Sequence, residues 1–160
     1  MKVFCVPGPS HIGITTRPRG GDWLEDDVAA WKTAGVDVVV SCLKPAEVTE
    51  LQLDDEAAAC ERHGLRFMSF PIQDRSVPKS SRAFAGLAAK LRKDLVAGKT
   101  IAVHCRQGIG RSALVVAGIL VLGGERPRDA FQKIAEARGC DVPDTAEQRA
   151  WVQNLSRVMG

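Results

Sequence analysis

Short apolar runs and segments of helical periodicity alternate along most of the chain. Four short runs predict strands, over residues 2–6, 36–42, 65–71 and 100–104. The run 36–42 is continuous and rich in β-branched residues, which is typical of a strand covered on both faces. Apolar positions at helical spacing predict helices over 22–34, 45–51, 54–63, 80–98 and 112–122, with two more that begin near 127 and 144. The long segment 7–21 is rich in proline and glycine and predicts a loop.

The order of these elements predicts the fold class. Strands separated by helices are typical of an α/β protein, here a three-layer α/β/α domain with a mainly parallel central sheet. No repeat, low-complexity stretch or linker divides the chain, so residues 1–160 are expected to form a single domain. Ligands of such sheets bind beyond the carboxyl ends of the strands, and the loops 72–79 and 105–111 begin at that end.

Two helix starts carry capping signals. Asp22, with Glu25 three residues later, predicts a capping box for the first helix, and Gly35 predicts the end of that helix. Ser80 or Ser81 predicts the cap of the helix that ends near residue 98.

Composition and charge exclude several classes of protein. With 45% hydrophobic and 26% charged residues, the chain is neither disordered nor fibrous. It has no apolar run of the ~18 residues that span a bilayer, no secretory signal and no Lys/Arg run that would follow nucleic acid, so neither a membrane nor a nucleic acid is expected as a partner. The five cysteines are widely spaced, which favours a reducing cytoplasm, and no metal-site spacing is present. No metal or other cofactor is therefore expected.

The segment HCRQGIGRS, residues 104–112, predicts a site for a phosphoryl group. It follows a buried strand and opens an apolar helix, whose free N–H groups and dipole attract an anion. Gly108 and Gly110 are expected to let the backbone adopt angles that a Cβ would resist, so that successive N–H groups turn inward. Arg111 can offer a planar fork to two phosphoryl oxygens, which a lysine cannot.

The same surroundings should act on the sulfur of Cys105. A helix N-terminus and adjacent cations favour a thiolate, so we expect Cys105 to be a nucleophile at neutral pH. Ser112, by its spacing, is placed to donate a hydrogen bond that stabilises the sulfur as it leaves in a second step. The alternative is a buried structural cysteine beside a glycine-rich turn.

This segment resembles the signature loop of the protein-tyrosine phosphatase superfamily, the pattern His-Cys-x5-Arg-Ser/Thr, and the chain is most similar to its small dual-specificity, kinase-associated-phosphatase-like branch. The resemblance implies that Cys105 is the nucleophile, Arg111 the phosphate clamp and Ser112 the hydroxyl donor. His104 would support the loop and tune the sulfur. The intervening residues are expected to bind the substrate phosphate; they are Arg106, Gln107, Gly108, Ile109 and Gly110, of which Gln107 departs from the Ala often found in the family.

A general acid is expected on a second loop. A leaving phenolate or alkoxide needs a proton, and Asp74 lies in the polar loop of SFPIQDRSVP, directly after a strand. This stretch resembles the family's acid loop in the form that the small dual-specificity enzymes carry. A turn residue or a helix cap is the structural alternative for Asp74.

Two more residues are implied by the resemblance. Gln148, in DVPDTAEQRAWV, resembles a glutamine that helps to hold the hydrolytic water in related small phosphatases, with Asp74 then acting as base. Glu47 resembles a buried acidic residue that ties the loop arginine in place. An exposed helical glutamine and a surface glutamate at a helix start are the respective alternatives.

The expected function is therefore a phosphatase that hydrolyses phosphate monoesters through a cysteinyl-phosphate intermediate. The expected partner is a phosphorylated protein or peptide, because the loop has Arg106 as its one additional cation and lacks the lysines usual in phosphoinositide enzymes. The chain has no tyrosine to build a deep aromatic recognition loop, so a shallow pocket is expected, for phosphotyrosine and also for phosphoserine or phosphothreonine. A rhodanese-like sulfurtransferase and a catalytically weak phosphopeptide-binding module are the alternatives. Arg111, Ser112 and Asp74 argue against the first, and the presence of Cys105, Arg111 and Asp74 argues against the second.

Overall fold

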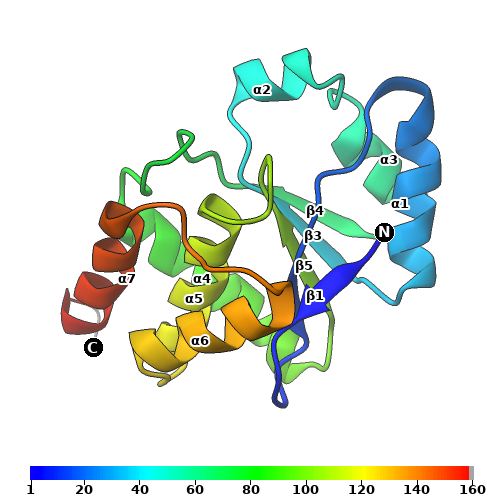
Figure 1. Ribbon diagram of the computed structural model, residues 1–160. Coiled ribbons are helices and arrows are strands. Elements are labelled where there is room, and N and C mark those ends of the chain that lie inside the picture. Colours follow the sequence, from blue (N-terminus) through cyan, green and yellow to red (C-terminus); the bar gives the residue numbers. More distant parts are fainter. Residues whose placement is uncertain (159–160) are drawn as a thin grey trace.

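The protein, described by a computed structural model over residues 1–158, is built around a five-stranded sheet (Figure 1). The strand order is β1-β2-β5-β3-β4. Their bounds are Val3–Cys5 for β1, Ile12–Thr15 for β2, Val38–Ser41 for β3, Arg66–Ser69 for β4 and Ile101–His104 for β5. The pairs β2–β5, β5–β3 and β3–β4 are parallel, and β1–β2 is antiparallel. The mainly parallel sheet expected from the sequence is confirmed.

Helices cover both faces of the sheet, which confirms the three-layer arrangement. Figure 1 shows α1 and α3 on one side and α4, α5, α6 and α7 on the other. Their bounds are Leu24–Thr33 for α1, Glu56–Arg62 for α3, Ser81–Val96 for α4, Arg111–Leu122 for α5, Pro127–Arg138 for α6 and Ala146–Val158 for α7. The short helix α2, Pro45–Glu50, follows β3. Among residues 1–158, no helix is both long and apolar enough to cross a bilayer.

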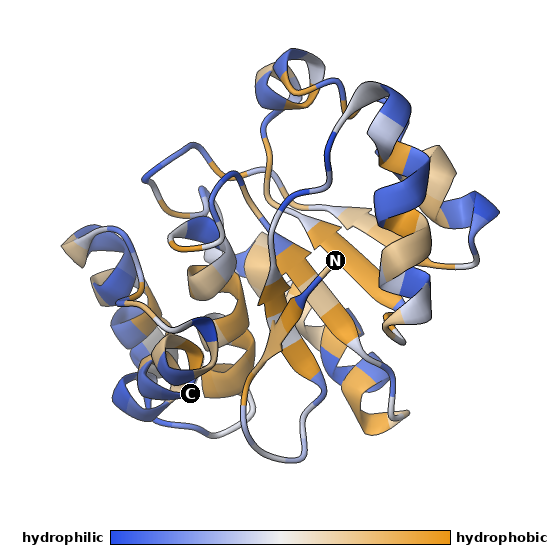
Figure 2. Cartoon of the chain, turned by 45° about the vertical axis from the view of Figure 1, so that its right-hand side comes forward, coloured by the Kyte–Doolittle hydropathy of each residue, from blue (hydrophilic) through white to orange (hydrophobic). Residues whose placement is uncertain are grey.

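The two core clusters follow from the alternation of side chains along the central strands. Val38 and Val40 pack into the cluster under α4–α7, whereas Val39 packs into the cluster under α1 and α3. In β5, Val103 and Ala102 divide in the same way. Figure 2 shows the strands as a continuous hydrophobic centre. A sheet buried on both faces thus holds the carboxyl ends of β3 and β5 side by side, and the site is built there.

The prediction of a loop over 7–21 is wrong in its middle, because Ile12–Thr15 forms β2. All four residues are buried, but the run is short and interrupted by Gly13, and proline and glycine flank it. A Cβ at Gly13 would lie 2.4 Å from the carbonyl oxygen of Phe4 on the neighbouring strand. Gly13 weakens the strand pattern in the sequence, but its missing side chain is what lets β1 pair closely with β2.

The predicted capping box at the first helix is also wrong. Asp22 lies inside a short 3-10 turn, Gly21–Trp23, and α1 begins without a side-chain cap. Glu25 instead accepts hydrogen bonds from Arg62 and pairs with His63, so it ties α1 to α3 rather than capping its own helix. The other helix signals are confirmed: the Ser80 side chain accepts from the N–H of Ala83 at the start of α4.

Candidate active site

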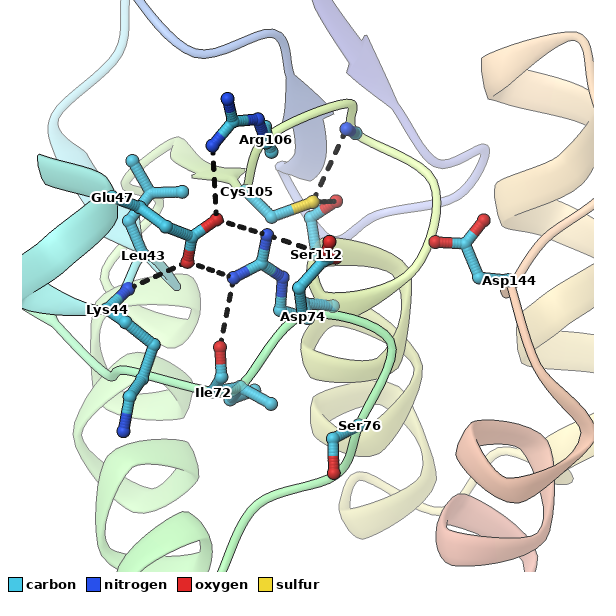
Figure 3. Close-up of polar contacts among 12 residues, drawn as sticks. Leu43, Lys44, Glu47, Ile72, Asp74, Ser76, Cys105, Arg106, Ser112 and Asp144 are labelled. Atoms are coloured by element: carbon cyan, nitrogen blue, oxygen red, sulfur yellow. Dashed lines mark hydrogen bonds and ion pairs between the residues drawn. The ribbon is translucent and has the colours of Figure 1, made fainter. Parts of the chain in front are cut away.

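The loop after β5 arranges hydrogen-bond donors around the sulfur of Cys105 (Figure 3). Cys105 is 3% exposed, and its Sγ lies 3.2 Å from Ser112 Oγ. The N–H of Gly108 donates to the same sulfur over 3.3 Å. Gly108 has a φ of +74°, a left-handed conformation that favours glycine and turns this N–H inward. Two polar groups therefore converge on the sulfur, the Ser112 hydroxyl and the Gly108 N–H.

Gly110 is a glycine for a different reason from the one expected. Its φ is −93°, which any residue adopts, so the predicted need for unusual backbone angles holds at Gly108 and not here. A Cβ at position 110 would instead lie 2.5 Å from Oδ2 of Asp144. Asp144 thus reaches over the phosphate loop from the segment before α7, and a side chain at position 110 would have to displace its carboxylate.

The Arg111 side chain is only 1% exposed, and its guanidinium is held by Glu47 and by the backbone of Ile72. Its Nη1 lies 2.6 Å from Oε1 of Glu47 and its Nη2 lies 3.0 Å from Oε2, a bidentate pair. Nη1 also donates to the carbonyl oxygen of Ile72 over 3.0 Å. Burial raises the pKa of Glu47, but the hydrogen bonds from Arg111 and from the Lys44 N–H outweigh it and hold that pKa below its usual range. The contact between Glu47 and Arg111 that the resemblance implied is present.

Asp74 reaches the same guanidinium from the acid loop. Its Oδ1 lies 3.3 Å from Nη2 of Arg111, and its side chain is 59% exposed. Burial lowers the pKa of Arg111, but Glu47 and the charges of Cys105 and Asp74 raise it above its ordinary value. The next residue, Arg75, has a φ of +60°, a left-handed conformation uncommon outside glycine. The acid loop thus turns sharply where it meets the site.

A cavity of about 100 Å³ lies over the sulfur. It is lined by Asp74, Arg75, Cys105, Arg106, Gln107, Gly110, Arg111 and Asp144. The cavity therefore has room for a phosphate group directly over the sulfur.

Two loop residues expected to bind substrate do not line this cavity. The Gly108 N–H points at the sulfur, and the Ile109 side chain packs against the larger core cluster. Arg106 does line the cavity, and its guanidinium also pairs with Glu50, at 3.1 Å. Glu50 therefore partly neutralises the charge of Arg106, which the sequence analysis expected to bind substrate.

His104 is anchored behind the loop by residues that the sequence analysis missed. Its Nε2 lies 2.6 Å from Oε2 of Glu56, which is 2% exposed, and its ring stacks on Trp31 with centroids 5.8 Å apart. Its Nδ1 lies 3.4 Å from the carbonyl oxygen of Cys105. The ring is thereby fixed against the backbone of Cys105.

Gln148 is fully buried and stands behind the cavity rather than in its wall. Its Oε1 accepts from the N–H groups of Asp144 and Thr145, and its own N–H donates to the Thr145 hydroxyl, which makes a capping box at the start of α7. Its Nε2 donates to the carbonyl oxygen of Ser76 over 3.0 Å. Gln148 therefore links α7 to the acid loop.

Two further residues near the loop were not foreseen. Asp144 lines the cavity, and Arg138 of α6 donates to the carbonyl oxygens of Gly108 and Gln107 over 3.1 and 3.3 Å. Both come from segments more than 25 residues away in the sequence, and only the fold brings them to the loop. Across residues 1–158, no group of three or more His, Cys, Asp or Glu side chains is arranged to hold a metal ion.

Comparison with known proteins places this site in a family. Residues 13–125 match the profile of the family "Polymorphic toxin system, DSP-PTPase phosphatase". The chain is 28% identical to protein tyrosine phosphatase type IVA 3 of Mus musculus, over 86% of this chain and 70% of that protein. It is 24% identical to cyclin-dependent kinase inhibitor 3 of Rattus norvegicus, over 78% of this chain and 59%, less than two thirds, of that protein.

Solved structures show the same fold. Kinase associated phosphatase with its catalytic-site cysteine replaced by serine matches with a TM-score of 0.85 and 18% identity, over 92% of this chain and 86% of that one. Tk-PTP in the active form matches with a TM-score of 0.79 and 22% identity, over 97% and 96% of the two chains. With the family profile covering most of its length, the chain belongs to the DSP-PTPase phosphatase family and lies in the dual-specificity branch of the protein-tyrosine phosphatase superfamily.

Proposed function

We propose that this phosphatase hydrolyses phosphoprotein monoesters, phosphotyrosine foremost, through a phosphorylated Cys105. One observation carries the proposal: the Cys105 sulfur lies under a phosphate-sized cavity, within reach of the Gly108 N–H and the Ser112 hydroxyl. Arg111 lines the same cavity, with its guanidinium already oriented by Glu47. A thiolate nucleophile and fixed donors for the phosphoryl oxygens are the two requirements of this chemistry.

In the first step, the Cys105 thiolate attacks phosphorus while the bond to the leaving oxygen breaks. Arg111 and the loop N–H groups neutralise the charge on the equatorial oxygens, which is where charge gathers in the transition state. Asp74 transfers its proton to the leaving oxygen, so that a neutral phenol or alcohol departs. Asp74 suits this role because it lines the cavity from a separate loop.

In the second step, a water attacks the phosphorus of the cysteinyl phosphate. The P–S bond breaks, its electron pair returns to Cys105, and inorganic phosphate leaves. Ser112 supports this step, because a hydroxyl 3.2 Å from the sulfur can donate to the thiolate as it forms. The water's proton passes to a carboxylate in the cavity wall.

The preference for phosphotyrosine rests on relatives, because the cavity itself admits more than one kind of phosphate ester. The cavity over Cys105 has room for the phosphate of either an aryl or an alkyl ester. TpbA of P. aeruginosa, which matches with a TM-score of 0.63 and 20% identity, has been solved in complex with pTyr. Protein tyrosine phosphatase type IVA 3, a relative in sequence, carries the same specificity in its name.

The proposal extends to the setting of the enzyme. Residues 1–160 would act as one phosphatase domain without a metal, since Arg111 and backbone donors meet the phosphoryl oxygens. A reducing compartment, the cytoplasm, suits a chain with five free cysteines, because a catalytic thiolate survives there. Phosphorylated proteins rather than nucleic acids or membranes are its proposed partners.

A substrate panel measured in a chelator tests this proposal. We expect release of phosphate from phosphotyrosyl peptides, slower release from phosphoseryl and phosphothreonyl peptides, and near-complete loss in Cys105→Ser. Exclusive turnover of a phosphorylated lipid or nucleotide would overturn the substrate assignment. Sulfur transfer from thiosulfate to cyanide without phosphatase activity would instead favour the rhodanese-like alternative, and tight phosphopeptide binding without turnover would favour the binding module.

A further inference from the structure

We propose that Asp144 is the general base of the second step, the residue that takes the proton of the hydrolytic water. This inference deepens the proposed function and rests on the cysteinyl-phosphate intermediate described there. Asp144 lines the cavity over Cys105 together with Asp74 and Arg111. Figure 3 shows it on the opposite side of the phosphate loop from Glu47, with one carboxylate oxygen turned toward the loop.

The close approach of Asp144 is a built feature of the loop. The space that a Cβ at Gly110 would fill is occupied by Oδ2, Cγ and Cβ of Asp144, which lie 2.5–3.2 Å from that point. Since the φ of Gly110 is ordinary, the conformation of the loop does not require a glycine there. The absence of a side chain at Gly110 therefore lets the Asp144 carboxylate lie directly against the phosphate loop.

Asp144 is also held in place through its backbone. Its N–H and that of Thr145 both donate to Oε1 of Gln148, over 3.1 and 3.2 Å. Gln148 in turn donates to the carbonyl oxygen of Ser76 on the acid loop. The segment that carries Asp144 is thus linked to α7 and to the loop that carries Asp74.

Asp144 differs from the other carboxylates around the cavity in having its lone pairs free. Glu47 is bound by Arg111 through both oxygens, Glu50 pairs with Arg106, and Asp74 lies 3.3 Å from Arg111. Within residues 1–158, no hydrogen bond or ion pair engages the Asp144 carboxylate. A base needs a free lone pair aimed at the water. Of the two carboxylates that line the cavity, Asp74 has one oxygen beside the Arg111 guanidinium, whereas both oxygens of Asp144 are free to accept a proton.

The predicted water-holding role of Gln148 fits this arrangement less well. Gln148 is fully buried, and its amide is engaged by three backbone groups, those of Asp144, Thr145 and Ser76. Its contribution is to position Asp144 rather than to meet the water.

The chemistry balances with Asp144 as the acceptor. Water attacks phosphorus from the side open to the cavity, and its proton moves to a carboxylate oxygen of Asp144. The P–S bond breaks with its electron pair returning to Cys105, and phosphate leaves. Asp144 is exposed to solvent, so it can lose the proton to bulk water before the next turnover. Asp74 then serves the first step as acid, and the two steps use different carboxylates.

Pre-steady-state kinetics separates the two steps. With an aryl phosphate as substrate, we expect Asp144→Asn to keep a burst of one phenol per enzyme at the wild-type rate, because the first step is intact. Its steady-state rate should fall about 100-fold, the lower range of what general-base catalysis contributes. Glu147→Gln, which removes a charge from the exposed first turn of α7, is the matched control and should behave as the wild type.

A second variant separates a chemical role from a structural one. Asp144→Ala should show the same slow second step, and added formate, a small carboxylate, should restore part of that step without changing the burst. Asp74→Asn should slow the burst and leave hydrolysis of the intermediate near the wild-type rate.

The outcomes are distinct. A steady-state rate within twofold of wild type in Asp144→Asn, or a slowed burst in that variant, would overturn the assignment of Asp144 while leaving the proposed function intact. Slowing of both steps in Asp74→Asn would overturn it as well, because Asp74 would then be the base. A wild-type enzyme that turns over with no phosphorylated Cys105 would instead remove the proposed function on which the inference rests.

Discussion

The two sides of the cavity to which we assign phosphate binding and proton transfer are built in opposite ways. Cys105 and Arg111 are 3% and 1% exposed, and each is held by several hydrogen bonds. Asp74 is 59% exposed, and Asp144 is also open to solvent. Both acidic residues lie on irregular segments outside the helices and strands, whereas the phosphate loop is fixed between β5 and α5.

This difference matches two different needs. Donors that stabilise charge on a phosphoryl group are most effective when they are fixed before the substrate arrives and shielded from water. Groups that exchange protons with solvent between turnovers must remain accessible. We therefore expect changes on the buried side to cost binding and chemistry together, and changes on the exposed side to affect single steps.

The largest effect is expected from the buried side, in Arg111→Lys. A lysine cannot keep the bidentate pair with Glu47 and offers no planar fork to the phosphate. The value of kcat/KM should fall by about 10³-fold, the upper range for loss of a fixed charge-stabilising donor. Steady-state kinetics on a phosphotyrosyl peptide measures it. A loss below tenfold would show that the orientation of the guanidinium is unimportant.

On the exposed side, Asp74→Asn should cost about 100-fold on a phosphotyrosyl peptide, because its leaving group needs a proton. The loss should shrink for aryl phosphates whose phenols are more acidic and need less protonation. Comparing kcat/KM across a series of leaving groups checks this. A loss of equal size across the series would assign Asp74 to phosphate binding instead of proton transfer.

The smallest effect, on the stability of the fold, is expected for Glu47→Gln, which changes the residue that anchors Arg111. The pKa of Glu47 is lowered in the folded state, so its carboxylate stabilises the fold above its unfolded pKa of about 4.3. That contribution is lost as the pH falls through the lower folded-state pKa. At pH 7 the variant should be less stable by about 1–3 kcal/mol, the range for a hydrogen bond to a charged group.

Urea unfolding of wild type and Glu47→Gln at several pH values tests this prediction. The difference between the two free energies of unfolding should be largest at neutral pH and narrow below about pH 4. A difference that stays constant across this range would mean that the charge of Glu47 does not carry the effect.

The sequence predicted those features that lie within one short segment. Cys105, Arg111 and Ser112 are seven residues apart at most, and the strand before them and the helix after them are strongly apolar. Their placement around one cavity therefore follows from local pattern alone. The sheet order and the strand β2 do not, because Ile12–Thr15 owes its place to pairing with residues 3–5 and 101–103 rather than to its own composition.

The supporting residues could not be found in the same way. Glu56, Arg138 and Asp144 reach the loop from three different segments, and none carries a motif that distinguishes it from a surface residue. Glu47 was found only through resemblance to a family. Gly110 indicated a special position in the loop. The sequence does not tell, however, whether a glycine is needed for an unusual backbone angle or for the approach of another chain segment.

The central claim is that phosphate passes through Cys105. Rapid quenching of the wild-type enzyme during turnover of a phosphotyrosyl peptide, followed by peptide mapping, tests it most directly. We predict one phosphoryl group on the peptide that contains Cys105, and none on the enzyme when the same experiment is done with Cys105→Ser. Phosphate release by Cys105→Ser at the wild-type rate, or a phosphoryl group on another residue, would contradict this account.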